Sequence, residues 1–203
     1  MFVPDHGSYR HGKATLHEYG MRVPLLMQWK GTIKPGSRND SIVANIDIAP
    51  MLFDLCGITP PEGYQMDGRS FKPALFGKQY DEREFLFGEL GHSRCVKSKE
   101  WKYIAVRYPK ELQRRVEFGE VFKGFDGGEI KRPYLTRNGH LGHYASKSNP
   151  HYFDADQLYH LSSDREEDQN VADNYLEVTK RMKDKLSLEL KKFPKRPFGE
   201  FTQ

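Results

Sequence analysis

The chain has 203 residues, of which 37% are hydrophobic and 13% aromatic, so it is long enough to bury a core. Its 32 basic and 28 acidic residues are mixed along the chain and leave a net charge of +4, which argues against a dedicated nucleic-acid-binding surface. No apolar stretch approaches the roughly 20 residues that a membrane-spanning helix needs. The two cysteines, Cys56 and Cys95, have the spacing of neither a metal site nor a disulfide framework, and we expect Cys56 to be a buried apolar residue.

The first eighty residues follow an α/β pattern. Apolar and β-branched residues predict extended segments over 23–29 and 41–48. A helix is expected to begin after Asp47, which suits the N-cap position, and to end at Gly57 as its C-cap. Residues 59–80, which contain several prolines and glycines, are predicted to be loop-like.

After residue 80 the pattern changes to that of an antiparallel sheet with a helix against it. Strands are expected over 84–88, 101–108 and 157–161, and helical spacing of apolar residues predicts a long helix over 175–193. Residues 109–150 have no assignable pattern, which is typical of a functional loop or an interface segment. The tail, 194–203, is expected to run over the surface.

The motif that carries the most chemistry is Asp5-His6-Gly7, followed by His11-Gly12-Lys13. A carboxylate beside an imidazole can provide ligands for a divalent cation, and a nearby ammonium can contact an anion held on that cation. The simpler alternative is an Asx-type turn with an exposed histidine and a solvated Lys13.

Six segments in the same order resemble the C-terminal half of type I sulfatases, which belong to the alkaline-phosphatase-like superfamily. The resemblance covers residues 1–180 apart from 109–150, and order makes it far more specific than any single motif. The six segments are Asp5-His6-Gly7 with His11–Glu18; Arg22–Gly31; Asp47–Ile58; Asp67–Phe71 with Leu75–Gly77; Lys99–Ile104; and Gln157–Leu161 with Asp164, Glu167 and Asn170–Ala172.

The resemblance implies the fold and a division into two domains. The expected fold is α/β: the C-terminal part of an alkaline-phosphatase-like α/β sandwich, followed by a small antiparallel sheet with a packed C-terminal helix. Residues 1–80 would belong to the catalytic α/β domain and residues 81–203 would form the C-terminal subdomain.

The resemblance also implies a site. By matching position, Asp5 and His6 would be metal ligands for Ca²⁺, with Mg²⁺ as the alternative ion. Lys13 would be a catalytic residue that contacts the sulfate. His92 and Arg94 precede the strand at Trp101, on a loop that approaches the substrate in the family, so they are candidate substrate-binding residues, although a plain surface position is an equal alternative.

Other residues are expected to have structural roles. His140, His143 and His151 lack the spacing of a zinc site and are predicted to be loop histidines. Glu18 and Arg22 are expected to support the N-terminal turn or to form a local ion pair.

The sequence also departs from the family. The nucleophile of type I sulfatases is a formylglycine made from a cysteine or serine within C/S-x-P-x-R, and no such motif occurs here. Pro4 stands where serine is usual, and His160 where aspartate is frequent. The chain is therefore predicted to be a sulfatase fragment, inactive by itself, whose partners are a sulfated small molecule or glycan and either the missing N-terminal portion or a second copy of the chain. The complete protein is expected to be periplasmic, secreted or lysosomal.

Two other functions are left open at this point. A phosphodiesterase or phosphatase of the same superfamily would retain a metal site but attack through a threonine or serine. A non-catalytic binding module would need no nucleophile, although the retained Asp5, His6 and Lys13 weigh against it.

Overall fold

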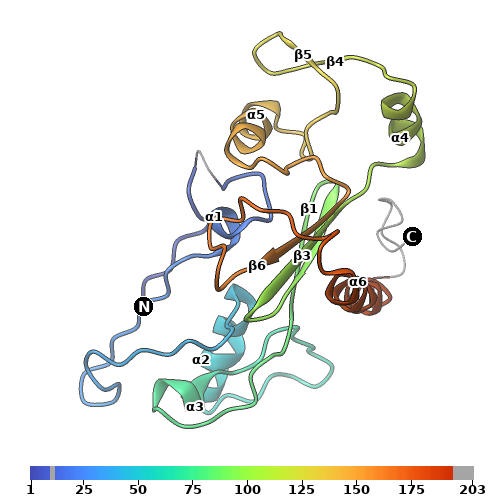
Figure 1. Cartoon of the computed structure of the whole chain (residues 1–203). Coiled ribbons are helices and arrows are strands. Elements are labelled where there is room, and N and C mark those ends of the chain that lie inside the picture. Colours follow the sequence, from blue (N-terminus) through green and yellow to red (C-terminus); the bar gives the residue numbers. More distant parts are fainter. Residues whose placement is uncertain (10–11, 194–203) are drawn as a thin grey trace. The chain divides into compact units, whose positions relative to one another are not determined.

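The computed structural model describes residues 1–9 and 12–193, so His11 of the N-terminal motif and the expected surface tail lie outside the described residues. Figure 1 shows the chain with its helices and strands labelled. The chain divides into two compact units. The first unit combines Met1–Val3 with Leu25–Leu86, and the second combines Pro4–Pro24 with the chain from Phe87 onward. The expected assignment of residues 1–80 to a catalytic domain concerns the parent family and stays a prediction.

The first unit is built around a short helical region. The 3₁₀ turn η1 (Asn45–Asp47) leads into α2 (Ile48–Cys56), and a further short helix, α3, covers Lys72–Leu75. Helix α2 ends, as predicted, at Gly57, whose φ of 64° is left-handed and favours glycine. Asp47 occupies the N-cap position, but its buried carboxylate accepts hydrogen bonds from the backbone N–H groups of Ala44 (2.8 Å) and Arg69 (2.8 Å) and pairs with Arg83. Asp47 therefore ties three segments of this unit together and does not cap α2.

The predicted strands over 23–29 and 41–48 were wrong. The first contains only an isolated bridge between Phe2 and Leu26, and the second is irregular before η1. An extended segment becomes a strand only when a neighbour completes its backbone hydrogen bonds, and the rest of the first unit supplies no such neighbour. Cys56 is exposed, which corrects the expectation that it is buried.

The second unit contains the expected antiparallel sheet, in the order β1-β2-β3-β6. Its strands are β1 (Leu86–Leu90), β2 (Ser93–Lys97), β3 (Trp101–Val106) and β6 (Asp156–His160). The register of β3 aligns Cys95 of β2 with Ile104, and Ile104 with Gln157 of β6. Strand β3 is buried over most of its length because it lies in the interior of the sheet.

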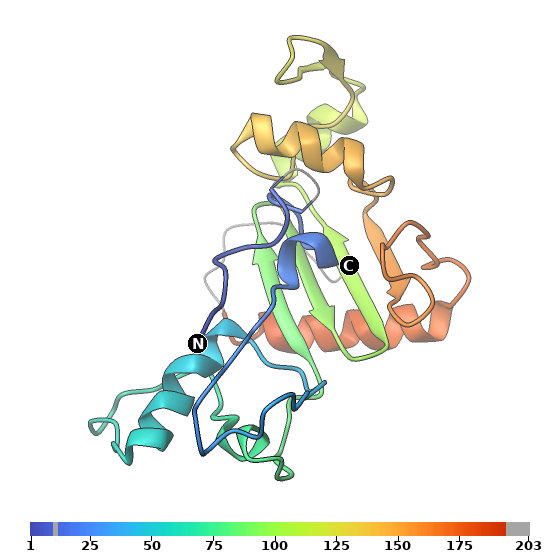
Figure 2. The same cartoon turned by 90° about the vertical axis from the view of Figure 1, so that its left-hand side faces the viewer.

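Two helices lie on opposite faces of this sheet, as Figures 1 and 2 together show. The short helix α1 (Glu18–Met21) lies on one face, and α6 (Leu176–Leu190) crosses the other. Met182 and Leu186 of α6 are fully buried, as the helical spacing of apolar residues predicts. The sheet with its packed C-terminal helix is thus confirmed.

Residues 109–150 are ordered into four elements that the sequence pattern does not predict. These are α4 (Lys110–Glu117), β4 (Phe122–Lys123), β5 (Glu129–Ile130) and α5 (Gly139–Ser148). Asn138 caps α5, since its side-chain oxygen accepts a hydrogen bond from the backbone N–H of Leu141 at 3.2 Å. His140 and His143 therefore lie on a helix, which corrects their prediction as loop residues.

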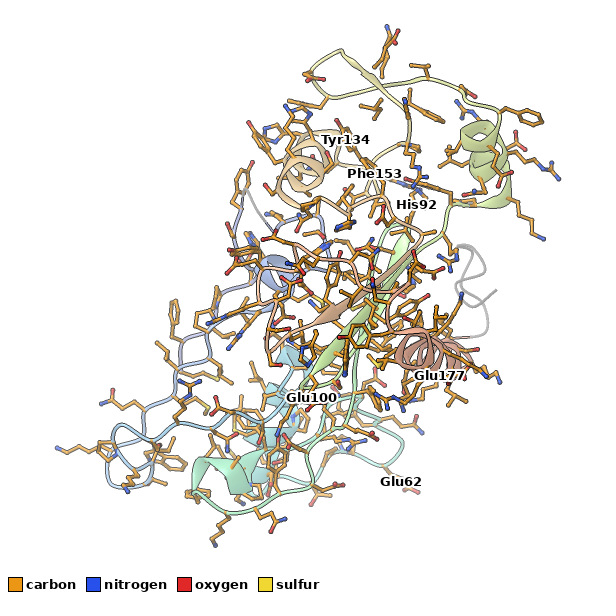
Figure 3. All side chains as sticks on the ribbon, in the orientation of Figure 1. Glu62, His92, Glu100, Tyr134, Phe153 and Glu177 are labelled. Atoms are coloured by element: carbon orange, nitrogen blue, oxygen red, sulfur yellow. The ribbon has the colours of Figure 1, made fainter. Side chains whose placement is uncertain are left out.

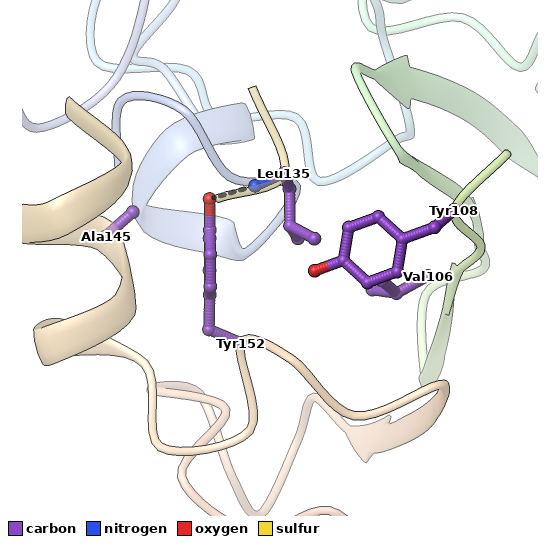
Figure 4. Packing of buried hydrophobic residues seen from close by; sticks show 5 residues of the cluster. All are labelled: Val106, Tyr108, Leu135, Ala145 and Tyr152. Carbon is purple, nitrogen blue, oxygen red and sulfur yellow. Dashed lines mark hydrogen bonds between the residues drawn. The ribbon is translucent and has the colours of Figure 1, made fainter. Parts of the chain in front are cut away.

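A separate apolar cluster fixes α5 against the end of β3. Its buried members are Val106, Tyr108, Leu135, Ala145 and Tyr152, drawn in Figure 4. The Tyr152 hydroxyl accepts a hydrogen bond from the backbone N–H of Leu135 at 3.2 Å.

No helix within residues 1–9 and 12–193 combines the length and the apolar character required to cross a bilayer.

Candidate functional site

The Asp5-His6 segment is held by backbone hydrogen bonds to the start of α1. The N–H of Gly7 donates to the carbonyl of Gly20 (3.1 Å), and that of Ser8 donates to the carbonyl of Tyr19 (2.8 Å). A Cβ atom on Gly7 would lie 1.9 Å from the Tyr19 carbonyl oxygen. Glycine is therefore required here by close approach of two backbone segments.

The structure brings Asp5, His6 and Lys13 together. The Lys13 Nζ lies 3.0 Å from His6 Nε2, and Asp5 Oδ1 lies 3.8 Å from the same nitrogen. Because an ammonium can only donate, His6 Nε2 is the acceptor, and His6 Nδ1 then donates to the carbonyl of Gly7 at 2.7 Å. His6 Nε2 thus faces Lys13 and Asp5, and Nδ1 faces the carbonyl of Gly7.

The donor chemistry of Asp5 and His6 fits a divalent cation. The Asp5 side chain is 88% exposed and His6 is partly exposed, so both remain accessible to an ion. A separation of 3.8 Å between the two donor atoms suits two ligands of one Ca²⁺, since each ligand lies about 2.3–2.6 Å from that ion. Asp5 and His6 would provide only two of the roughly six to eight ligands that Ca²⁺ requires. Within residues 1–9 and 12–193 no group of three or more His, Cys, Asp or Glu side chains could complete this set of ligands.

Directly after this segment, a buried ionic network joins α1 to the sheet. We call it the buried tetrad: Glu18, Lys97, Lys102 and Glu167. The Lys102 Nζ lies 2.7 Å from Glu18 and 2.9 Å from Glu167, and both Lys102 and Glu167 have fully buried side chains. Lys97 pairs with Glu18 at 2.6 Å. Two ammonium and two carboxylate groups therefore neutralise one another inside the second unit.

The pKa values of the tetrad follow from this arrangement. Burial alone would raise the pKa of Glu18, but the positive charges of Lys102 and Lys97 outweigh it and lower that pKa to about 2. Burial raises the pKa of Glu167, against the opposing effect of Lys102. Burial alone would lower the pKa of Lys102, but Glu167 and Glu18 raise it above its ordinary value. Lys102 therefore stays charged, bound on both sides by carboxylates.

The tetrad corrects the expected role of Glu18 and adds residues that the motif analysis did not single out. Glu18 forms long-range ion pairs instead of a local one, and its backbone N–H also donates to the Glu167 carboxylate. Lys102 lies in the family motif at 99–104, and Glu167 lies in the motif that follows residue 161. Nothing in the sequence indicates that these two residues form an ion pair. A lysine in the middle of an apolar strand is the one signal that a buried partner must exist.

His92 and Arg94 make contacts with other residues of the second unit. His92, labelled in Figure 3, has its ring 5.2 Å from that of Tyr108, and burial lowers its pKa. Arg94 has a buried side chain whose guanidinium lies 3.2 Å from Glu89 and donates to the carbonyl of Ser93 at 2.7 Å. Arg94 is therefore engaged by its own chain, and a substrate-binding role for these two residues stays a prediction.

Comparison with known proteins agrees with this architecture. The family described as N-sulphoglucosamine sulphohydrolase, C-terminal, matches residues 5–108. An ulvan-active sulfatase of Formosa agariphila is 29% identical over 184 residues, which cover 86% of this chain and 33% of that protein. The steryl-sulfatase of Rattus norvegicus is 42% identical over 84 residues, which cover 41% of this chain and 15% of that protein.

Solved structures share the fold. A protein solved in complex with its substrate, D-glucosamine-2-N,6-O-disulfate, matches with a TM-score of 0.58 at 19% identity, over 90% of this chain and 31% of that one. The chain spans a third or less of the length of these relatives. By its motif order, its matched segment and its fold, the chain belongs to the sulfatases, in the family of the C-terminal part of N-sulphoglucosamine sulphohydrolase.

Proposed function

We propose that this chain supplies one part of the metal and sulfate site of a sulfatase that hydrolyses sulfate esters of carbohydrates. The observation that carries the proposal is the cluster of Asp5, His6 and Lys13. The Lys13 Nζ and the Asp5 Oδ1 lie 3.0 Å and 3.8 Å from His6 Nε2. The carbohydrate class is supported by the ulvan-active relative, which matches most of the chain, whereas the steryl-sulfatase matches less than half of it.

In this proposal the residues of the chain have distinct tasks. Asp5 and His6 would hold a divalent cation, Ca²⁺ or Mg²⁺, which would stabilise negative charge on a sulfate oxygen. Lys13 would place its ammonium against the same sulfate, where it opposes the negative charge that develops as the ester bond breaks. A cation bound by His6 Nε2 would take the lone pair that the Lys13 ammonium contacts and would leave that ammonium free to meet the sulfate.

The chain contains no C/S-x-P-x-R, so no nucleophile of the family's type is present in it. We propose that the remaining ligands and the nucleophile come from a further portion of the enzyme. The first unit supports this view, because it exposes several large apolar side chains that such a portion would cover. They are Leu26, Trp29, Ile46, Leu52, Ile58 and Tyr64. The complete enzyme would act outside the cytosol or in lysosomes, as expected from the family.

The proposal is tested by binding of inorganic sulfate to the chain, followed by NMR of the His6 and Lys13 side chains. Sulfate is expected to shift both, and Lys13→Ala is expected to weaken binding about tenfold, which corresponds to loss of one charge-assisted contact. Lys180→Ala, an exposed lysine of α6, is the matched control. Asp5→Asn should not change the affinity for sulfate in the absence of Ca²⁺. It should abolish the increase in that affinity that Ca²⁺ produces. Sulfate shifts that are absent at His6 and Lys13, or equal in both lysine variants, would contradict the proposal.

A further inference from the structure

Four aromatic side chains from three separate segments meet beside the N-terminal cluster. We call them the ring cluster: Tyr9, Phe125, His140 and Tyr144. His140 is its centre, with ring centroids 4.7 Å from Phe125, 5.0 Å from Tyr144 and 6.4 Å from Tyr9. These separations lie in the range of direct aromatic contact.

The ring cluster has a rigid support. His140 and Tyr144 lie one turn apart on α5, so their side chains share one face of that helix. Phe125 lies in the turn between β4 and β5, which is closed by a hydrogen bond of 2.7 Å from the Gly124 N–H to the Gly128 carbonyl. Next to it, the Tyr134 hydroxyl lies 3.1 Å from His143 Nδ1, and Figure 3 shows Tyr134 beside α5.

The ring cluster is accessible. Tyr9 is 50% exposed and Phe125 is 57% exposed, and His140 and Tyr144 are half-buried beneath them. Large aromatic side chains exposed together, on a support of ordered elements, mark a surface that binds a ligand more often than isolated exposed residues do.

The ring cluster is continuous with the candidate sulfate site. The Lys13 Nζ lies 5.7 Å from the centre of the Tyr9 ring and 3.0 Å from His6 Nε2. A ligand that places an anionic group on Lys13 would therefore have its neighbouring atoms over Tyr9 and, next, over His140 and Phe125.

The shape and polarity of the ring cluster favour a sugar over a flat apolar skeleton. Its rings are tilted against one another by 53° to 90°, so they offer separate small apolar faces at angles to one another, which suit a puckered sugar ring better than a large planar skeleton. The ring cluster combines apolar ring faces with the imidazole nitrogens of His140 and the hydroxyls of Tyr9 and Tyr144, as a ligand with both C–H faces and hydroxyl groups requires.

We propose that Tyr9, Phe125 and His140 form a stacking surface for the pyranose ring of a sulfated carbohydrate whose sulfate is bound by Lys13. This inference rests on the proposed function and extends it, because it adds Tyr9 and, outside residues 1–80, Phe125 and His140 as side chains that select a sugar. It also gives a role to the segment 109–150, which has no counterpart among the family motifs in the sequence.

The test is an NMR titration of the whole chain with three probes: inorganic sulfate, N-acetylglucosamine and N-acetylglucosamine 6-sulfate. The sulfated sugar is expected to bind about three- to tenfold more tightly than inorganic sulfate, which is the effect of one or two aromatic contacts. Phe125→Ala is expected to remove this gain while leaving inorganic sulfate binding unchanged. Phe125→Trp should retain it, and Phe118→Ala, which removes a ring that is 88% exposed elsewhere, should not affect it.

The outcomes separate this inference from the proposed function. If inorganic sulfate shifts Lys13 but the sulfated sugar binds no more tightly, the stacking surface is wrong and the sulfate site stands. If sulfate does not bind but the unsulfated sugar shifts the signals of Phe125 and His140, the stacking surface stands and the sulfate site fails. Absence of shifts at Phe125 and His140 with both sugars, or tighter binding of a steroid sulfate through the same rings, would overturn the inference.

Discussion

At the scale of single residues, His17 is the group whose protonation the fold opposes most clearly. It is buried, its Nε2 lies 3.2 Å from the Tyr159 hydroxyl, and its Nδ1 contacts the Thr15 hydroxyl. Burial first, and then the positive charge of Lys102, lowers the pKa of His17 from 6.5 to about 3. The folded state therefore holds this imidazole neutral, next to the residues that begin α1.

The depressed pKa of His17 predicts a loss of stability in mild acid. Below pH 6.5 His17 of the unfolded chain binds a proton, whereas His17 of the folded chain binds one only near pH 3. The stability of the fold therefore decreases as the pH falls from 6.5 to 3. The expected slope approaches 1.4 kcal/mol per pH unit, about the value for one proton. His17→Gln, which keeps a hydrogen-bonding side chain, should flatten the profile between pH 6.5 and 4.5. Urea unfolding as a function of pH measures this, and identical slopes for the two proteins would contradict it.

Glu18 adds a second acid-sensitive step at lower pH. Its pKa of about 2 lies below the ordinary value of 4.5, so the stability that it contributes is present above pH 4.5 and is lost toward pH 2. The raised pKa of Glu167 has the opposite sign and favours folding at the acid end. The loss of stability that His17→Gln leaves below pH 4.5 is therefore expected to come from Glu18 together with the other carboxylates whose pKa values are lowered, which are Asp54, Glu120, Asp156 and Glu189.

At the scale of elements, the buried tetrad joins α1, β2, β3 and the turn after β6. Its ion pairs link residues that are far apart in sequence. Lys102 binds both Glu18 and Glu167, which are 149 positions apart. Lys102 also donates to the carbonyl of Leu16 at 3.0 Å. The tetrad thus fastens the segment that carries Asp5, His6 and Lys13 to the antiparallel sheet.

This connection predicts strong coupling between Lys102 and Glu167. Glu167→Gln keeps an acceptor for the Glu18 N–H but leaves the buried Lys102 and the partly buried Lys97 with one carboxylate, so it should cost about 3–5 kcal/mol of the free energy of unfolding. Adding Lys102→Met to Glu167→Gln should recover part of that loss, because the buried charge is balanced again. A double-mutant cycle in urea measures the coupling, and simple additivity of the two substitutions would contradict it.

At the scale of the whole molecule, the chain combines Lys13, the side chain that we propose binds sulfate, with a sequence that contains no nucleophile motif of the family. A sulfatase needs both, because the metal and ammonium stabilise charge but do not attack sulfur. In our proposal α5, the turn between β4 and β5 and the N-terminal segment supply the sugar-facing surface, whereas the first unit exposes apolar side chains such as Trp29 and Leu52.

The isolated chain is therefore expected to show no turnover of a chromogenic aryl sulfate, with or without Ca²⁺. The measurement is release of the aryl alcohol at high protein concentration, with buffer alone as the reference. Turnover above that reference, and equal in Lys13→Ala, would show that the chain carries an independent catalytic site and would contradict the assignment of Lys13.

The sequence by itself determined the family, helix α2 with its end at Gly57, the long helix α6 and three of the four strands of the sheet, because these depend on local motifs and on hydrophobic periodicity. It did not predict β2. It also predicted that Asp5, His6 and Lys13 lie together, since they are close in the chain and Gly7 permits the turn.

Only the tertiary structure decided which distant residues meet. The register of β3 carries Lys102 to Glu18 and Glu167, and the cluster around Tyr152 places α5 where its rings reach Tyr9. Segments 23–29 and 41–48 have the composition of strands yet form none, because a strand exists only with a neighbour to receive its hydrogen bonds. The local sequence pattern limits which secondary structure a segment can form, whereas strand pairing and burial decide which one it does form.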